Sequence, residues 1–257
     1  MISSNRLLLA AIFSSVLFSC APPAKVQKVE MTTYQVSPGD QAMVDSVIIR
    51  KVQPYKNQVD SAMNKVLAVS AEPMEKGLPE SKLGNFFSDA CLNVTREMYK
   101  PQDGHPCDFA FFNLGGLRNS LPKGELTRGS IFELMPFENE LVVLTLHGST
   151  VKKIFNFIAA KGGSPVSGLR MGIQDGQPVN IEIGMVPFDS SATYKVVTSD
   201  YLANGGDQCF FLQEATKNEA VGIKIRDALI NVLEAQGKKN EVVRARLDQR
   251  ITVKHAK

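Results

Sequence analysis

The apolar residues of this chain switch several times between the two-residue spacing of strands and the 3.6-residue spacing of helices. Runs of strand length cover residues 107–112 and 141–146, and the second is rich in β-branched residues. Shorter strands are predicted at 169–173, 179–184, 194–199 and 251–253. Hairpin-like strands mixed with separated helices are typical of an α+β fold with mixed β-sheets, and they argue against a doubly wound parallel sheet.

Two helices are predicted in the first half of the chain. From Asp45 to Ser70 the apolar spacing is loosely helical but is interrupted by Pro54. We therefore expect a strand or short helix to about residue 52 and a helix from about Tyr55. A second helix should follow Gly84, with Asn85 as a plausible N-cap. Its apolar face would hold Phe86, Phe87, Ala90, Cys91 and Val94.

Two further helices are predicted in the second half. Ser149 is expected to cap a helix that ends at Gly162 and Gly163. The buried face of that helix would hold Val151, Ile154, Phe155 and Ile158. A last helix should run from about Ile223 to Ala235 and turn four apolar residues inward: Ala228, Leu229, Val232 and Leu233.

Composition indicates an ordinary globular protein, with 44% hydrophobic and 21% charged residues. The 29 basic and 26 acidic residues leave a net charge of only +3, which is spread thinly along the chain. Nucleic-acid-binding domains usually cluster basic residues on one face. We therefore expect no nucleic-acid partner.

The N-terminus reads as a targeting segment. Apolar residues 7–18 follow a short polar start, and the run has signal-peptide length but is short for a membrane span. Leu17-Phe18-Ser19-Cys20 resembles a bacterial lipobox. This predicts a signal peptide over 1–19, a lipidated Cys20 with a flexible tether over 20–40, and a folded domain over 41–257. An ordinary signal peptide with a chance cysteine is the alternative.

A lipidated Cys20 would anchor the protein to a membrane of the bacterial cell envelope. Bacterial lipoproteins carry several acyl chains, and stable anchoring takes more than one. No acidic run follows Cys20, so we expect the periplasmic side of the outer membrane.

Three cysteines remain at positions 91, 107 and 209, an odd number whose spacing matches no zinc or redox motif. They read as small buried residues. A disulfide between Cys107 and Cys209 in an oxidising compartment is the alternative.

Three segments carry glycines and polar groups that packing alone does not require. Asn113-Leu114-Gly115-Gly116-Leu117-Arg118 directly follows a predicted strand. Paired glycines let a ligand approach the backbone closely, and an arginine there could reach an anion. The same pattern is also compatible with a plain turn at the end of a strand.

The other two segments each contain an aromatic residue. Phe137 follows a proline just before a strand, where it could be a ligand platform or, more commonly, a core plug. The segment after the strand at 194–199 could form a pocket wall, because it holds an aromatic residue, two glycines and a carboxylate: Tyr201, Gly205, Gly206 and Asp207. An ionised aspartate only accepts hydrogen bonds, which suits an amine or a ribose hydroxyl. An Asn-Gly turn with a solvated aspartate is the alternative.

Together these segments resemble the C-terminal domain of the 5′-nucleotidase/UDP-sugar hydrolase family. The resemblance covers about residues 40–255 and includes three further stretches. These are Leu83-Gly84-Asn85, Leu146-His147-Gly148-Ser149 and Ser167-Gly168-Leu169-Arg170.

The resemblance implies a role for each matching residue. In the family, this domain grips the nucleoside of a nucleotide and two aromatics sandwich its base, which corresponds to Phe137 and Tyr201 here. The ribose-binding carboxylate matches Asp207, and the phosphate-side residues match Asn113 and Arg118. The remaining matches near the base are Asn139, Ser167 and Gly168.

The match has one departure. Many family members carry an additional arginine before the second helix, where this chain has Lys76 and Lys82. A lysine lacks the planar fork that binds phosphate bidentately, so the grip on the phosphate is expected to be weaker.

The family's reaction uses two divalent metal ions held by an N-terminal metallophosphoesterase domain. Its Asp-x-His and Gly-Asn-His-Asp/Glu signatures do not occur in this sequence, and His105, His147 and His255 adjoin no metal-ligand pattern. We therefore expect no metal, cofactor or catalytic residue in this chain. A separate metallophosphatase chain would supply the hydrolysis. The alternatives are an envelope lipoprotein that binds nucleosides or nucleotides without catalysis, and a structural lipoprotein that retains only the fold.

Overall fold

The computed structural model describes residues 31, 33 and 46–254. The predicted signal peptide, Cys20 and nearly all of the tether therefore lie outside the described residues. The chain divides into two units, residues 1–51 and 52–257. Helix α2 (Ser46–Met63) begins in the first unit and ends in the second.

Helix α2 corrects the prediction for residues 45–70. A single helix runs through Pro54, where a break was expected. A proline removes one hydrogen bond and can bend a helix, but the helix can continue beyond it. The end of this stretch is a strand, β1 (Val66–Ser70), rather than more helix.

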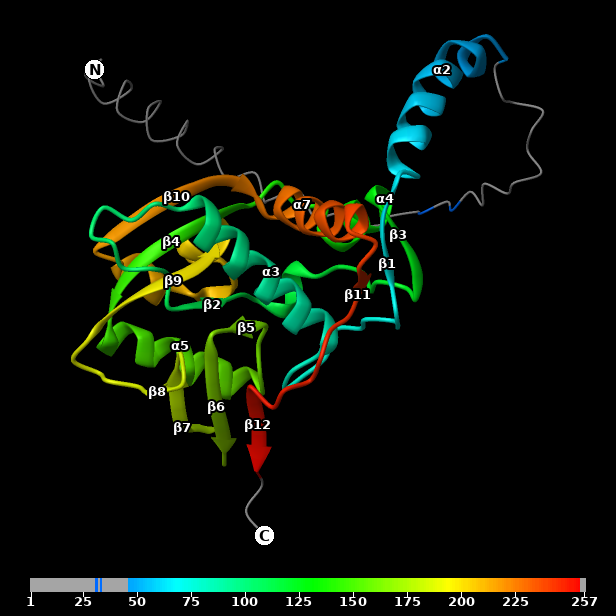
Figure 1. The fold of residues 1–257 in the computed structure, drawn as a ribbon. Helices are drawn as coiled ribbons and strands as arrows, with labels where there is room; N and C mark the ends of the chain where they lie inside the picture. Colours follow the sequence, from blue (N-terminus) through cyan, green and yellow to red (C-terminus); the bar gives the residue numbers. More distant parts are fainter. Residues whose placement is uncertain (1–30, 32, 34–45, 255–257) are drawn as a thin grey trace, which may run out of the picture. The chain divides into compact units, whose positions relative to one another are not determined.

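A five-stranded mixed sheet forms the centre of the second unit (Figure 1). Its strand order is β10-β4-β9-β2-β5. The strands are β10 (Lys217–Lys224), β4 (Glu140–His147), β9 (Thr193–Ser199), β2 (Phe109–Phe111) and β5 (Val166–Ser167). Strand β2 runs parallel to β9, and the other neighbouring pairs are antiparallel.

Helices cover both faces of this sheet, and the alternation of side chains along its strands decides what each face contacts. On one face, Leu141 and Val143 of β4 join the cluster formed with α3 (Lys82–Met98) and α7 (Ile225–Lys238). On the other face, Val142 and Leu144 join the cluster formed with α5 (Gly148–Lys161).

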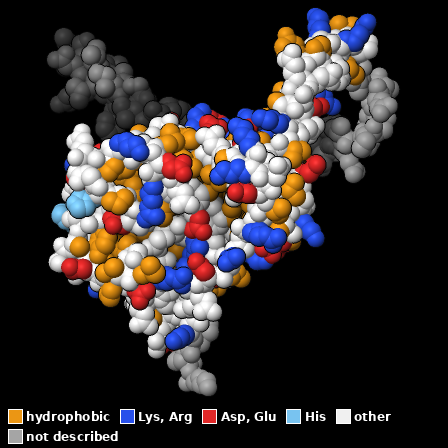
Figure 2. Space-filling model, viewed as in Figure 1, with side chains coloured by type: hydrophobic (Ala, Val, Ile, Leu, Met, Phe, Trp, Pro, Cys, Tyr) orange, Lys and Arg blue, Asp and Glu red, His pale blue; other side chains and the backbone are white. Residues whose placement is uncertain are grey.

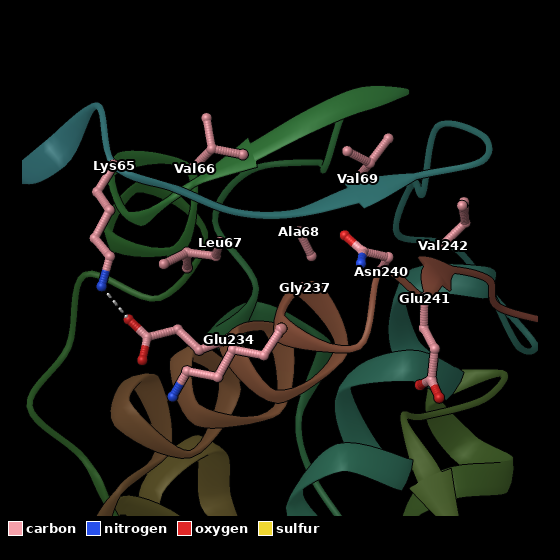
Figure 3. A pocket seen from close by; sticks show the side chains of 11 residues that line it. Lys65, Val66, Leu67, Ala68, Val69, Glu234, Gly237, Asn240, Glu241 and Val242 are labelled. Carbon is pink, nitrogen blue, oxygen red and sulfur yellow. Dashed lines mark hydrogen bonds and ion pairs between the residues drawn. The ribbon is translucent and has the colours of Figure 1, made fainter.

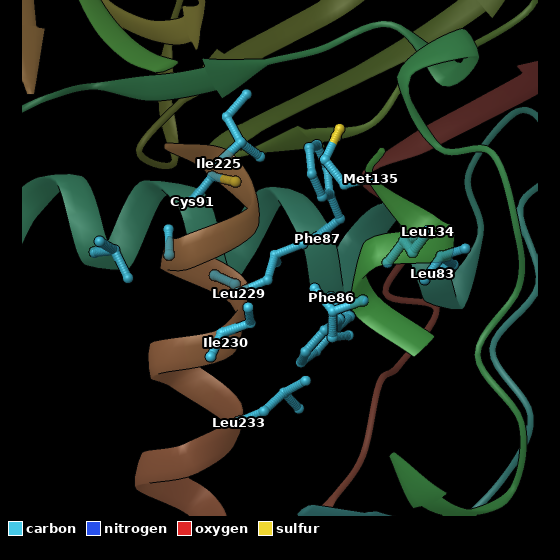
Figure 4. Close-up of a cluster of buried hydrophobic side chains, with 14 of the residues drawn as sticks. Leu83, Phe86, Phe87, Cys91, Leu134, Met135, Ile225, Leu229, Ile230 and Leu233 are labelled. Atoms are coloured by element: carbon cyan, nitrogen blue, oxygen red, sulfur yellow. The ribbon is translucent and has the colours of Figure 1, made fainter. Parts of the chain in front are cut away.

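The first of these clusters shows why α3 and α7 lie side by side. Figure 4 shows Phe87 and Cys91 of α3 facing Ile225 and Leu229 of α7, with Met135 closing one end. The predicted apolar face of the helix after Gly84 is confirmed, because all five of its residues are buried. The α+β fold class is likewise confirmed.

Two smaller sheets complete the second unit. One has the order β11-β1-β3, with β11 (Val242–Val243) and β3 (Gly124–Thr127). The other has the order β12-β6-β7-β8. Its strands are β12 (Ile251–Lys254), β6 (Leu169–Gln174), β7 (Gln177–Ile183) and β8 (Val186–Pro187). Helix α4 (Arg128–Leu134) follows β3 directly.

The C-terminal end of α7 passes close beneath β1, beside a groove lined by both elements (Figure 3). Gly237 makes this contact possible, since a Cβ there would lie 1.9 Å from the carbonyl oxygen of Leu67. An ion pair between Lys65 and Glu234 closes one end of the groove at 2.8 Å.

Two predicted helix caps are wrong by a few residues. Ser81, rather than Asn85, caps α3, because its side chain accepts a hydrogen bond from the Gly84 amide. Asn85 instead lies inside the helix and donates to the Arg246 carbonyl at 2.8 Å. Helix α5 begins at Gly148 with His147 as its N-cap, two residues before the predicted Ser149.

The three cysteines outside the N-terminal segment are buried and unpaired, so no Cys107–Cys209 disulfide is present. Burial raises the pKa of the Cys107 thiol to about 11 and that of Cys209 to about 12. Both side chains therefore remain uncharged thiols at neutral pH.

The surface carries mixed charge. On the face shown in Figure 2, lysine and arginine side chains lie among acidic and apolar ones rather than in one basic patch. Within the described part of the chain, no helix has both the length and the apolar composition that a membrane span requires.

Candidate functional site

Three chain segments meet at one edge of the five-stranded sheet because of its topology. Strands β2 and β9 are parallel neighbours, so the residues that follow them emerge at the same edge. Strand β4 is antiparallel to β9 and pairs Leu141 with Ser199, so the residues that precede β4 reach this edge as well. These are the three segments that the sequence singles out.

The segments enclose a hollow of about 260 Å³. Its lining comprises Asn113, Gly115, Gly116, Arg118, Phe137, Asn139, Tyr201 and Asp207. Six of the eight predicted binding residues are thus brought together, and the paired glycines of the first segment complete the wall.

Asp207 is the most constrained polar group of the hollow. Its Oδ2 accepts a hydrogen bond from Asn113 Nδ2 at 2.6 Å, and its Oδ1 accepts one from the Tyr201 hydroxyl at 2.9 Å. The Asp207 amide in turn donates to the Tyr201 hydroxyl oxygen at 3.2 Å. The Asn113 contact ties the segment after β2 to the segment after β9, and the Tyr201 contacts hold the latter segment internally.

The backbone around Asp207 is left-handed. Asp207 has φ 49° and Gln208 has φ 68°, a region that L-residues other than glycine adopt reluctantly. Two consecutive non-glycine residues in this conformation beside a pocket indicate that local strain is tolerated to place the Asp207 carboxylate.

Gln208→Gly should stabilise the protein by about 0.5–1 kcal/mol. Glycine removes the left-handed strain, which costs an L-residue about 1–2 kcal/mol. Part of this gain is lost because glycine has more conformational entropy in the unfolded chain. Urea unfolding measures the difference. Gln177→Gly, at an exposed strand position without a positive φ, serves as the control and should destabilise by about 0.5–1 kcal/mol. A destabilised Gln208→Gly variant would show that the Gln208 side chain contributes more than the strain costs.

The two aromatic rings of the hollow are partly open to solvent. Phe137 is 40% exposed and Tyr201 is 44% exposed, so Phe137 is not the buried core plug that was the alternative. The Arg118 guanidinium lies 6.0 Å from the centre of the Phe137 ring, which brings a fixed positive charge to the same wall.

The loop that carries Phe137 is held by its neighbours. Glu138 forms ion pairs with Lys224 and Arg226 at the start of α7. The Asn139 carbonyl accepts a hydrogen bond from the Ile225 amide at 2.9 Å. The start of α7 therefore positions the loop. The Arg226 guanidinium also packs 4.1 Å from the centre of the Phe132 ring of α4, the helix that precedes this loop.

Hydrogen bonds from Lys224 and Arg226 lower the pKa of Glu138 from 4.5 to about 2. A carboxyl whose pKa is lower in the folded state stabilises the protein above its unfolded pKa, and this contribution is lost as the pH falls through the folded pKa. Wild type should therefore exceed Glu138→Gln in unfolding free energy near neutral pH. This difference in unfolding free energy should disappear as the pH falls from about 4.5 to about 2. A gap that persists at the lowest pH would contradict the ion-pair account.

Two predicted residues lie elsewhere. Ser167 is buried in β5, and Gly168 follows it with φ 76°; neither lines the hollow. A Cβ at Gly168 would lie 2.7 Å from the Asp108 carbonyl oxygen, so this glycine is required by the close approach of the chain after β5 to β2. Gly168 lines a separate hollow together with Arg170 and Arg250.

Lys76 and Lys82 lie in the stretch where the resemblance implies an additional arginine, and their surroundings differ. Lys76 donates to the Leu117 carbonyl at 3.0 Å, next to Arg118. Lys82 is paired with Glu72. Neither lysine lines the hollow.

The described residues do not fit a metal centre. No group of three or more His, Cys, Asp or Glu side chains among them is arranged to hold a metal ion. His147 caps α5 and His105 lies in an exposed loop, while His255 is outside the described residues.

Comparison with known proteins decides the family. The C-terminal domain of 5′-nucleotidases matches residues 63–214, which is more than half of the chain and includes every residue of the hollow. The chain belongs to this family. The matched segment contains β2, β4 and β9, whose ends form the site.

Individual relatives agree with this assignment. An apyrase from Tabanus yao is 27% identical over 209 residues, covering 72% of this chain and 38% of the apyrase. A 5′-nucleotidase from Vibrio cholerae is 24% identical over 204 residues, covering 75% of this chain and 35% of that protein.

A solved structure shows the same fold. The crystal structure of a 5′-nucleotidase precursor from Thermus thermophilus superposes with a TM-score of 0.68 at 29% identity, covering 83% of this chain and 44% of that one. The match to this chain thus spans less than half the length of each of these proteins.

Proposed function

We propose that this protein is the substrate-recognition component of a 5′-nucleotidase-type phosphoester hydrolase. One observation carries the proposal: two accessible aromatic rings, a fixed carboxylate and an arginine converge on a single hollow. This combination suits a nucleotide, which presents a flat base, a ribose with hydroxyl donors and an anionic phosphate.

Each group has a role in this proposal. Phe137 and Tyr201 stack on the base, and stacking is worth about 1–3 kcal/mol per base in nucleic-acid binders. Asp207 accepts hydrogen bonds from the ribose, and Asn139 lies near the base. Arg118 offers the phosphate a planar fork of donors, with Asn113 on the same side.

We further propose that a separate metallophosphatase chain performs the hydrolysis with two divalent metal ions. The support is that the family resemblance implies two metal ions, whereas the described residues include no group of three or more His, Cys, Asp or Glu side chains arranged to hold one. We also propose that Cys20 carries the lipid anchor and holds the protein at the periplasmic side of the outer membrane. That proposal rests on the lipobox resemblance.

Thermal unfolding of the full-length protein with AMP, UMP and a UDP-sugar tests the recognition role. A ligand that binds only the folded state raises the melting temperature as its concentration increases. We expect a shift with at least one nucleotide and none with inorganic phosphate alone. The absence of a shift with any nucleotide at millimolar concentration would contradict the proposal.

Phosphate release tests the division of labour. The purified protein with AMP and added Mg²⁺, Mn²⁺ or Zn²⁺ should release no phosphate above the blank. Metal-dependent release by this protein alone would contradict a separate catalytic chain. Binding that no metallophosphatase converts into hydrolysis would instead indicate nucleotide capture.

A further inference from the structure

The Tyr201 hydroxyl both donates a hydrogen bond to Asp207 and accepts one from it. It donates to the carboxylate Oδ1 at 2.9 Å and accepts from the Asp207 amide at 3.2 Å. On the opposite side, Asn113 Nδ2 donates to Oδ2 at 2.6 Å. Each carboxylate oxygen therefore has one protein donor, and the carboxylate is held in one orientation although Asp207 is exposed.

This arrangement leaves a defined capacity. An ionised carboxylate has about four lone-pair sites, two on each oxygen. Among the described residues, Asn113 and Tyr201 fill one site on each oxygen, which leaves one site on each for a ligand. Two hydroxyl groups on adjacent carbons would satisfy both sites, whereas a single hydroxyl would satisfy one.

We propose that the Tyr201 hydroxyl is a positioning group: it fixes the second oxygen of the ribose-binding Asp207 carboxylate and thereby sharpens the preference of the site for ribonucleotides over 2′-deoxyribonucleotides. This inference rests on the proposed function, because the base must occupy the neighbouring hollow for the sugar to reach Asp207.

Phenylalanine at position 201 separates the two roles of this side chain. It would offer a base the same ring face but would leave Oδ1 without its protein donor. The carboxylate would then be held at one oxygen only, by Asn113, and could rotate away from the second hydroxyl. Pre-organisation of this kind raises affinity by reducing the ordering that binding requires.

Calorimetric titration of the full-length protein with AMP and dAMP tests the inference. The corresponding pairs with guanine, cytosine and uracil are included so that base preference does not conceal the sugar effect. Wild type should bind the ribonucleotide about tenfold more tightly than its 2′-deoxy counterpart, which corresponds to one hydrogen bond to a charged group. In Tyr201→Phe this ratio should fall to about two, with affinity for the deoxynucleotide retained.

Tyr194→Phe is the matched control. The Tyr194 hydroxyl likewise accepts a hydrogen bond from the Asp189 amide at 2.9 Å and donates one to the Asp189 carbonyl at 3.0 Å. It lies outside the hollow, so its removal should leave the ratio at the wild-type value. A purely structural role for the Tyr201 hydroxyl would change stability without changing the ratio.

The outcomes separate the two proposals. An unchanged ratio in Tyr201→Phe, or equal binding of both sugars by wild type, would overturn the inference and leave nucleotide recognition intact. Failure of wild type to bind any nucleotide would overturn both.

Discussion

Gly206→Ala should lower nucleotide affinity by about tenfold to a hundredfold with little change in the stability of the fold. A Cβ at position 206 would lie 2.5 Å from two ring carbons of Tyr201, so the ring must leave its place. The Tyr201 ring cannot move freely, because its hydroxyl is bonded to Asp207. The substitution would therefore displace one stacking surface and the carboxylate together. The loss of stacking alone is worth about 1–3 kcal/mol.

A double-mutant cycle shows whether Gly206 acts through the ring. Tyr201→Ala should lose about as much affinity as Gly206→Ala, and the double variant should lose no more than either single variant. Calorimetric titration with the best-bound nucleotide gives the three affinities. If the two losses add, Gly206 affects binding by another route and the ring-displacement account fails.

Gly237→Ala should lower the unfolding free energy by about 2–3 kcal/mol. Alanine normally improves a helix by about 1 kcal/mol over glycine, so the sign is opposite to the usual expectation. The new Cβ would lie 1.9 Å from the Leu67 carbonyl oxygen, and a backbone atom of β1 cannot rotate away as a side chain can. Helix α7 and β1 would have to separate, which loosens the packing of Leu233 and Leu67.

Chemical denaturation measures the unfolding free energy of Gly237→Ala, and Gly77→Ala is the control substitution. At Gly77 the nearest atom to a new Cβ is the Ser81 Cβ at 3.7 Å, an ordinary contact. Gly77→Ala should therefore change the unfolding free energy by no more than about 1 kcal/mol. Equal stability of Gly237→Ala and wild type would show that α7 and β1 can move apart at little cost.

The sequence singles out the segments that meet at the hollow, but it misses several of the strands around them. The strand that ends at Phe111 is wholly apolar, the strand that ends at Ser199 contains Val196 and Val197, and polar residues with paired glycines follow each of them. Their convergence follows from strand pairing, which no local pattern encodes. Residues 66–70 and 124–127 are not predicted as strands because they are short and irregularly buried. Residues 217–224 are not predicted as a strand because none of them is buried and the apolar run is weak.

Other differences have equally local causes. Pro54 was expected to break a helix that in fact continues through it. Gly168 does not line the hollow, and its left-handed backbone allows a close approach to the Asp108 carbonyl. The hydrogen bond between Tyr201 and Asp207 accompanies left-handed backbone at Gly205, Asp207 and Gln208, which the sequence suggests only through its paired glycines.

Calorimetric titration of the full-length protein with AMP, beside Phe137→Ala, tests the central claim most directly. Arg118→Ala is titrated in parallel to separate the phosphate contact from the base contact. We predict saturable binding by wild type, loss of binding in Phe137→Ala, and weakened AMP but retained adenosine binding in Arg118→Ala. Nucleotide binding that Phe137→Ala leaves unchanged would place the ligand elsewhere and contradict the account.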